Sequence, residues 1–172
     1  EKLIPQGQVG RFLLAGANAA VLETNDTTWR FAHDKLREEL LIGLTEGDRI
    51  FLHTKVATAL ETLYSDDSTR AASLAYHWSN AHSDEKEKQY SALAGKYVLR
   101  IGVNKEAVSY LTRAIDLAKA ANQLEKADLY HNLAEAYRGL GDTDNDYVYR
   151  RKALEILDCT VIESSDKRFG FD

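Results

Sequence analysis

Apolar residues at helical spacing, with no proline to interrupt them, most constrain how this chain can fold. The only proline is Pro5, so none occurs in the remainder of the 172 residues. Leu52, Val56, Leu60 and Leu63 recur three or four residues apart, which places them on one face of a helix. Further stripes of this kind occur at 71–78, 90–101, 107–118, 130–137 and 153–157. The pattern predicts a mostly-α chain after residue 45.

Polar residues and glycines indicate where these helices begin and end. Thr45 and Asp48 have the spacing of a capping box, in which each side chain accepts a hydrogen bond from the other residue's backbone N–H. Asn104 is placed to cap the helix of 107–118, and Gly102 to end the helix before it. The segments SDDS at 65–68 and GLGD at 139–142 separate further helices. These signals predict antiparallel helices joined by short turns.

Before residue 45 the pattern differs. Residues 29–33 (WRFAH) and, more weakly, 20–23 (AVLE) alternate as strands do, and the TNDTT segment between them is typical of a turn. We expect a short β-hairpin here, preceded by a helix around 9–15. Asp34 then occupies the expected N-cap position of a helix that continues to Leu44.

Small residues recur with a constant offset along the helical part. A first series superposes on a second after a shift of 39 positions: Ala94, Gly95, Val98, Gly102, Ala107, Leu111 and Ala114 correspond to Leu133, Ala134, Tyr137, Gly141, Asp146, Arg150 and Ala153. Small residues at fixed points let antiparallel helices approach closely. The pattern resembles the tetratricopeptide repeat, whose period is about 34 residues. Glu87, Asp146 and Arg150 depart from it, since they stand at positions that are usually small or apolar.

The chain from Phe31 onward also resembles the region that comes after the ATPase module in STAND-class signalling ATPases, such as large bacterial transcription activators and multidomain cyclases or kinases. The family pattern reads F-x-H-x-x-x-R-E, R-x-x-x-H-x-x-V-A, L-E, L-A-x-H, A-G and E-A. The matching residues are Phe31, His33, Arg37, Glu38, Arg49, His53, Val56, Ala57, Leu60, Glu61, Leu74, Ala75, His77, Ala94, Gly95, Glu106 and Ala107. Leu41 departs from the pattern, because an aromatic residue is common there.

This resemblance implies three parts. Residues 1–44 would form a partial winged-helix-like segment with its β-hairpin, and residues 45–158 would form tetratricopeptide-like helical repeats of an α-solenoid. Residues 159–172 would be a tail, which we expect to fray or to belong to a further helix. The ATPase module would lie before residue 1, and the absence of methionine, even at position 1, also predicts a piece of a longer protein.

Composition limits the classes of partner. A net charge of −5 argues against a nucleic-acid-binding surface, because phosphate contacts need clustered lysine and arginine. Cys159 is the only cysteine, so no disulfide can form within the chain, and a reducing, cytoplasmic compartment is expected. No apolar run approaches the roughly 18 residues of a membrane helix, so no membrane contact is expected.

No catalytic residue, cofactor or metal site is expected. His33 and His53 lack a second histidine or a cysteine at metal-ligand spacing, and His77 and His82 are five residues apart, on different helix faces. The DTDND segment at 142–146 lacks the glycine and glutamate of a calcium loop, which favours a capped turn. No phosphate loop of the type G-x-x-x-x-G-K-[ST] is present.

The first helix of each pair lines the concave face in a tetratricopeptide solenoid, and this predicts a partner-binding face. Its candidate residues are Gln89, Lys96 and Arg100 in the first copy, and Asp128, His131, Glu135 and Arg138 in the second. Mixed charge suits a protein, a peptide or an adjoining domain of the same chain. We therefore expect a non-catalytic scaffold and sensor region of a signalling ATPase. A free-standing tetratricopeptide adaptor is the first alternative, and a small hydrolase that uses His53 or His77 is the second.

Overall fold

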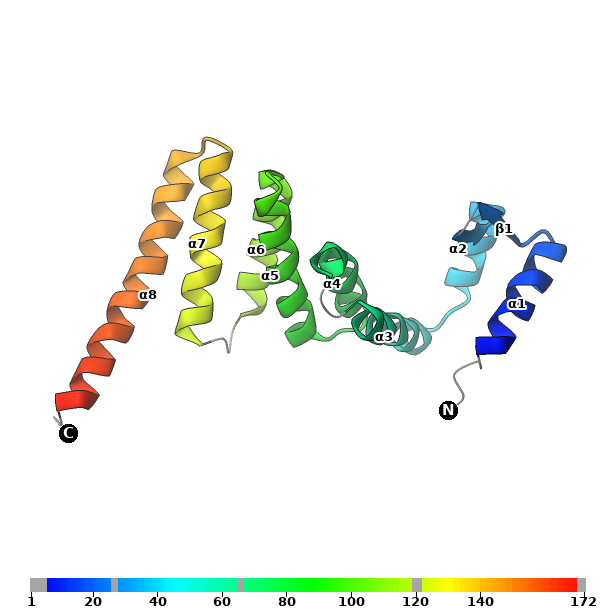
Figure 1. The fold of residues 1–172 in the computed structure, drawn as a ribbon, viewed down its shortest axis with the longest axis horizontal. Helices are drawn as coiled ribbons and strands as arrows, with labels where there is room; N and C mark the ends of the chain where they lie inside the picture. Colours follow the sequence, from blue (N-terminus) through cyan, green and yellow to red (C-terminus); the bar gives the residue numbers. More distant parts are fainter. Residues whose placement is uncertain (1–5, 26–27, 65–66, 119–121, 170–172) are drawn as a thin grey trace. The chain divides into compact units, whose positions relative to one another are not determined.

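The computed structural model describes residues 6–25, 28–64, 67–118 and 122–169. The chain divides into two compact units, Glu1–Asp48 and Arg49–Asp172. The boundary lies in the first turn of helix α3 (Glu46–Leu63). Figure 1 shows the elements in chain order. The predicted mostly-α fold with one small β-hairpin is confirmed.

The N-terminal unit contains two helices and the hairpin. Helix α1 (Gln6–Asn18) precedes strands β1 (Leu22–Asn25) and β2 (Thr28–Phe31), and helix α2 (Asp34–Ile42) comes after them. The strands are antiparallel, with Leu22 opposite Phe31. None of the described side chains from residue 8 to residue 48 is fully buried.

Both predicted strands were displaced from the observed ones. Strand β1 begins at Leu22 rather than at Ala20, because Ala20 has a φ of 55° in the left-handed region, which extended backbone does not use. Strand β2 ends at Phe31, so His33 lies beyond it. The predicted N-cap at Asp34 is wrong by one residue. The amide of Leu36 donates to the His33 carbonyl at 3.1 Å, and extended His33 occupies the cap position.

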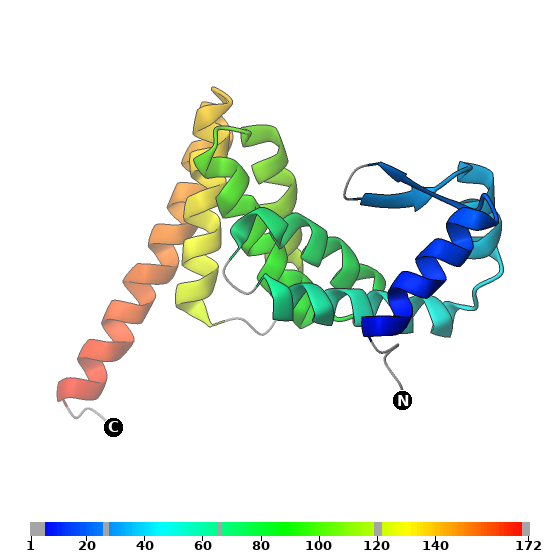
Figure 2. The same ribbon diagram turned by 45° about the vertical axis from the view of Figure 1, so that its right-hand side comes forward.

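The C-terminal unit is a series of helices. A short 3₁₀ helix, η1 (Ser68–Arg70), comes after α3, and the remaining helices are α4 (Ala71–Asn80), α5 (Asp84–Arg100), α6 (Asn104–Leu117), α7 (Gln123–Gly139) and α8 (Thr143–Phe169). Figures 1 and 2 show α5 to α8 packed side by side. The backbone of α8 continues to Phe169, so residues 159–169, which we expected either to fray or to belong to a further helix, have helical backbone.

The bounds of the helices repeat with the offset of 39 residues. Helix α5 spans 84–100 and α7 spans 123–139, while α6 begins at 104 and α8 at 143. The turns correspond too, because Gly102 and Gly141 have φ values of 82° and 77°. Left-handed backbone ends a helix at low cost when the residue is glycine. The predicted helix ends at these two glycines are confirmed.

The cap predictions had mixed outcomes. The capping box is present, since the amide of Thr45 donates to Asp48 at 3.2 Å and the amide of Asp48 donates to the Thr45 hydroxyl at 3.2 Å. Asn104 is not the cap of α6, because Val103 occupies that position and Asn104 is the first helical residue. The predicted capped turn at 142–146 is confirmed, with the Asp142 carboxylate accepting from the Asn145 amide at 3.1 Å.

The main core lies between α5, α6 and α7. Its buried side chains are Val98, Ala107, Leu111, Ala114, Ala118, Leu129, Leu133 and Ala136. A close approach at Gly95 sets the α5–α6 contact, because a Cβ added there would lie 2.7 Å from Cγ of Leu111. The small residues of the predicted repeat therefore lie where the helices meet.

Candidate partner-binding face

The candidate face is formed by α5 and α7, which are joined by two ion pairs. Lys96 contacts Asp128 at 2.5 Å, and Lys88 contacts Glu125 at 2.9 Å. Both lysines belong to α5 and both carboxylates to α7. The first helix of each predicted pair therefore lies beside the first helix of the next.

The seven predicted partner-binding residues are distributed over this face as three on α5 and four on α7. All are exposed except Glu135, which is half-buried. Glu135 accepts from Arg150 of α8 at 3.0 Å and also pairs with Arg138 on its own helix. It therefore joins α7 to α8 as well as lining the face.

The positive charges of Lys96 and Arg100 each have a neighbour on the face. The Lys96 ammonium is paired with Asp128, and the Arg100 guanidinium lies 5.4 Å from the centre of the Tyr97 ring. Both side chains are exposed, so neither interaction removes the charge from solvent. The face is a surface of mixed charge and not a concentrated positive spot.

Residues that depart from the repeat form buried or half-buried ion pairs. The Glu87 side chain is 6% exposed and accepts from Arg113 of α6 at 2.6 and 3.0 Å. Asp146 and Arg150 are paired with each other at 2.6 Å. A charged residue at a small or apolar position was the sequence signal for these contacts, but only the structure shows the partners.

Lys88 is a buried cation that the sequence did not reveal. Its side chain is 7% exposed and also contacts Glu85 at 3.0 Å. A hydrogen bond to Glu125 raises the pKa of Lys88 despite the opposing effect of burial. Lys88 therefore remains charged and joins α5 to α7 beneath the exposed residues of the face.

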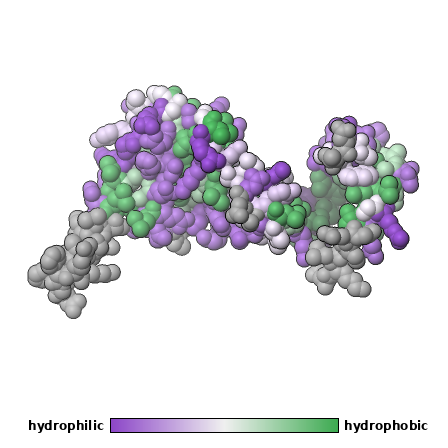
Figure 3. All heavy atoms as spheres, in the orientation of Figure 1, coloured by the Kyte–Doolittle hydropathy of each residue, from purple (hydrophilic) through white to green (hydrophobic). Residues whose placement is uncertain are grey.

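A hollow of about 470 Å³ lies between α7 and α8 at the edge of the face. It is lined by Leu124, Ala127, Asp128, His131, Arg150, Ala153, Leu154 and Leu157. Leu124 and Leu154 are 63% and 54% exposed. Figure 3 shows hydrophobic side chains in green over this part of α7 and α8. Asp128 and His131 are predicted site residues. Leu154 and Leu157 were missed because they belong to an ordinary helical stripe, and Leu124 because it lies outside every predicted stripe.

His53 and His77 meet between α3 and α4. Their Nδ1 atoms are 3.0 Å apart, and Tyr76 packs edge-on against both rings. At this distance one Nδ1 donates and the other accepts, which requires at least one neutral ring. Burial, and then the charge of His53, lowers the pKa of His77 below 6.5. His53 therefore forms a side-chain hydrogen bond with His77 of the neighbouring helix.

Glu61 lies near this junction and connects α3 to the next two helices. Its Oε1 accepts from Trp78 Nε1 at 3.0 Å and from Lys86 Nζ at 3.0 Å. Burial opposes ionisation, but hydrogen bonds from Lys86 and Tyr90 hold the pKa of Glu61 below its ordinary value. Burial and the Glu61 carboxylate in turn raise the pKa of Tyr90 to about 12.

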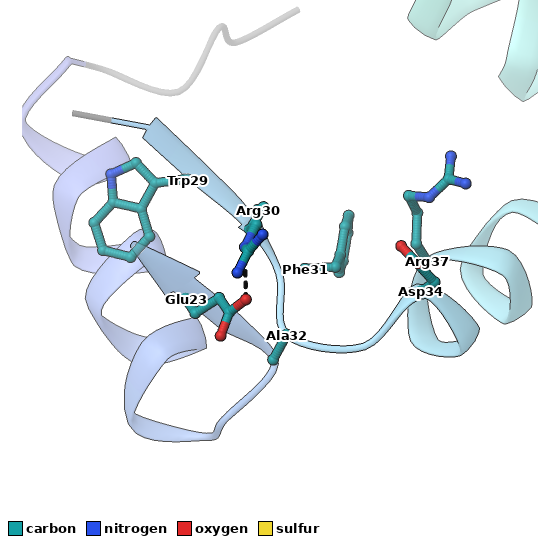
Figure 4. A pocket seen from close by; sticks show the side chains of 7 residues that line it. All are labelled: Glu23, Trp29, Arg30, Phe31, Ala32, Asp34 and Arg37. Atoms are coloured by element: carbon teal, nitrogen blue, oxygen red, sulfur yellow. Dashed lines mark ion pairs between the residues drawn. The ribbon is translucent and has the colours of Figure 1, made fainter. Parts of the chain in front are cut away.

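The N-terminal unit has a hollow of its own, of about 460 Å³. It is lined by Glu23, Trp29, Arg30, Phe31, Ala32, Asp34 and Arg37. Figure 4 shows the ion pair between Glu23 and Arg30, which are 2.6 Å apart across the two strands. Both side chains of the pair are largely exposed, so they contribute little to stability.

Comparison with known proteins gives no assignment. No protein-family model and no curated protein sequence matches the chain. Within the described residues, no group of three or more histidine, cysteine, aspartate or glutamate side chains could hold a metal ion. No helix in the same part of the chain is long and apolar enough to cross a bilayer.

Proposed function

We propose that this chain is a non-catalytic helical-repeat scaffold and sensor region of a multidomain signalling ATPase, located in the cytoplasm. It would hold a protein, a peptide or an adjoining domain on the α5–α7 face. The observation that supports the scaffold most directly is the offset of 39 residues, which relates α5 and the start of α6 to α7 and the start of α8. Repeated helix pairs present extended surfaces that serve binding.

The link to STAND-class ATPases rests on the sequence motifs, and contacts between motif residues support it. His53 of the R-x-x-x-H motif and His77 of the L-A-x-H motif are separated by 24 residues, yet their rings touch. Glu61 of the L-E motif anchors the same junction through Trp78 and Lys86. The spacing of the motifs is therefore consistent with a set of residues that hold α3 against α4 and α5.

The test uses the full-length protein that contains an ATPase module. Lys96→Glu together with Arg100→Glu should change the basal or effector-stimulated ATPase rate, because these exposed charges lie on the α5–α7 face. Arg151→Glu is the matched control, since Arg151 is 65% exposed on α8 and pairs only with the nearby Glu155 among the ion pairs found in the described residues. The isolated chain should hydrolyse no nucleotide.

Unchanged ATPase rates in the double variant would refute the sensor role of this face. A parent protein without any ATPase module would favour the alternative, a free-standing tetratricopeptide adaptor. Nucleotide-independent hydrolysis that is lost in His53→Gln or His77→Gln would favour the hydrolase alternative.

A further inference from the structure

The α5–α6 pair already binds a helix, namely α7, and this contact serves as a template for a second helix-binding site. Leu129 and Leu133 of α7 are 2% and 1% exposed within the core shared with α5 and α6. Ile115 of α6 and Ala118, the C-cap residue of that helix, line a small cavity together with Lys126 and Tyr130 of α7. Two ion pairs between α5 and α7, Lys88–Glu125 and Lys96–Asp128, complete this helix-binding surface, which we call the helix seat.

The hollow between α7 and α8 corresponds to the surface of α5 and α6 that binds α7, with each residue number increased by 39. Addition of 39 to Lys88, Ala114, Ile115 and Ala118 gives Ala127, Ala153, Leu154 and Leu157, and all four line the hollow. The two sites differ in how they are covered. Ala118 is 2% exposed under α7, whereas Leu157 is 37% exposed. Among the described residues, no helix covers the hollow as α7 covers the corresponding positions on α5 and α6.

The residues of the hollow also specify which helix fits. Lys88, which pairs with Glu125 of α7, corresponds to Ala127, so a carboxylate at the position of Glu125 would meet a methyl group. Lys96, which pairs with Asp128, corresponds to Glu135, so an aspartate at the position of Asp128 would lose its lysine and meet a carboxylate that Arg138 and Arg150 already contact. Leu124 replaces Glu85 and adds apolar surface to the rim.

From this correspondence we infer that the hollow between α7 and α8 binds an amphipathic α-helix of a partner protein, packed as α7 packs on α5 and α6. The helix carries leucines at the positions of Leu129 and Leu133, a small uncharged residue at that of Glu125, and a lysine or arginine at that of Asp128. The inference rests on the scaffold part of the proposed function and is independent of the ATPase assignment.

The probe is a synthetic peptide with the sequence of residues 122–141, acetylated and amidated, that carries Glu125→Ala and Asp128→Lys. Calorimetry against the full chain should show saturable binding. Leu154→Asp should weaken this binding at least tenfold. Leu124→Asp should do the same, and it is the safer variant because an aspartate is favourable in the first turn of a helix. Leu63→Asp is the matched control, as Leu63 is 71% exposed on α3, and it should leave the affinity unchanged.

Two control peptides make the result decisive. The probe with Leu129→Asp and Leu133→Asp should not bind. The unmodified sequence of 122–141 should bind at least tenfold more weakly than the probe. If an added peptide instead replaced α7 in its contact with α5 and α6, the unmodified sequence would bind more tightly than the probe. Absence of saturable binding, equal binding of the two sequences, or self-association of the chain that is lost in Leu154→Asp would overturn the inference. The ATPase assay of the full-length protein can fail without affecting this result.

Discussion

Replacement of Gly95 by leucine tests the close packing of α5 against α6. A Cβ at position 95 would lie 2.7 Å from Cγ, 2.9 Å from Cδ2 and 3.3 Å from the backbone nitrogen of Leu111. Leu111 is fully buried, so its side chain has no solvent-facing space into which to move. Overpacking of this kind typically costs about 1–3 kcal/mol. A better helix former returns up to about 1 kcal/mol.

We therefore expect Gly95→Leu to lower the free energy of unfolding by roughly 1–3 kcal/mol. Gly95→Ala should lower it less, because the same Cβ clash is offset by helix propensity. The measurement is urea unfolding monitored by far-ultraviolet circular dichroism. Ala59→Leu is the control, since Ala59 is exposed on α3 and a leucine there should change stability by no more than about 0.5 kcal/mol.

A double-mutant cycle with Leu111→Ala assigns the cost to this contact. Leu111→Ala alone should cost about 2–5 kcal/mol through the cavity that it leaves. In the Gly95→Leu background the same change makes room for the new side chain. The cost of the double variant should therefore be smaller than the sum of the two single costs by about 0.5–3 kcal/mol. A rise in stability for Gly95→Leu, or strict additivity, would show that Gly95 does not lie at a tight helix contact.

Other contacts of the helical unit give three more predictions. Arg113→Met should destabilise the chain by about 1–3 kcal/mol in urea unfolding, because it leaves the buried Glu87 carboxylate unpaired, and Glu87→Gln in the same background should recover part of the loss. Asp142→Ala should cost about 0.5–2 kcal/mol by removing the cap of α8, and Asp142→Asn should retain most of the stability. The pKa of His77 is lower in the folded chain than in the unfolded chain, so the unfolded chain takes up the imidazole proton at a higher pH. The contribution of neutral His77 to stability is therefore complete above about pH 6.5 and is lost as the pH falls through the folded-state pKa. His77→Gln should flatten the dependence of unfolding free energy on pH as the pH falls below about 6.5, and an unchanged slope would contradict this assignment.

Helix positions were largely predictable because they depend on local patterns. The apolar stripes and the glycines at 102 and 141 suffice to place α5 to α7. The predictions that were wrong concern a strand start and two helix caps, which depend on backbone angles rather than on residue type. Ala20 adopts a positive φ that its sequence does not indicate, and the caps expected at Asp34 and Asn104 are each the first helical residue instead.

The candidate face was predictable in outline, and its contacts were not. The period of 39 residues identifies which side chains share a face, because equivalent positions on stacked helices point in the same direction. The pairing of Lys96 with Asp128 depends on the distance between α5 and α7, which no local pattern determines. The hollow was missed for a related reason. Leu154 and Leu157 become informative only when their exposure is compared with that of Ile115 and Ala118, the corresponding residues beside α7.

Each of the two units contains one of the chain's two tryptophans. Trp29 of β2 is 38% exposed, whereas Trp78 of α4 is 8% exposed and donates its indole N–H to Glu61. Intrinsic fluorescence therefore separates the two units without an added label. In Trp29→Phe the emission reports the helical unit alone, as a blue-shifted band that a soluble quencher reaches poorly. The difference from the unmodified chain reports the hairpin, so loss of order in one unit can be distinguished optically from loss of order in the other.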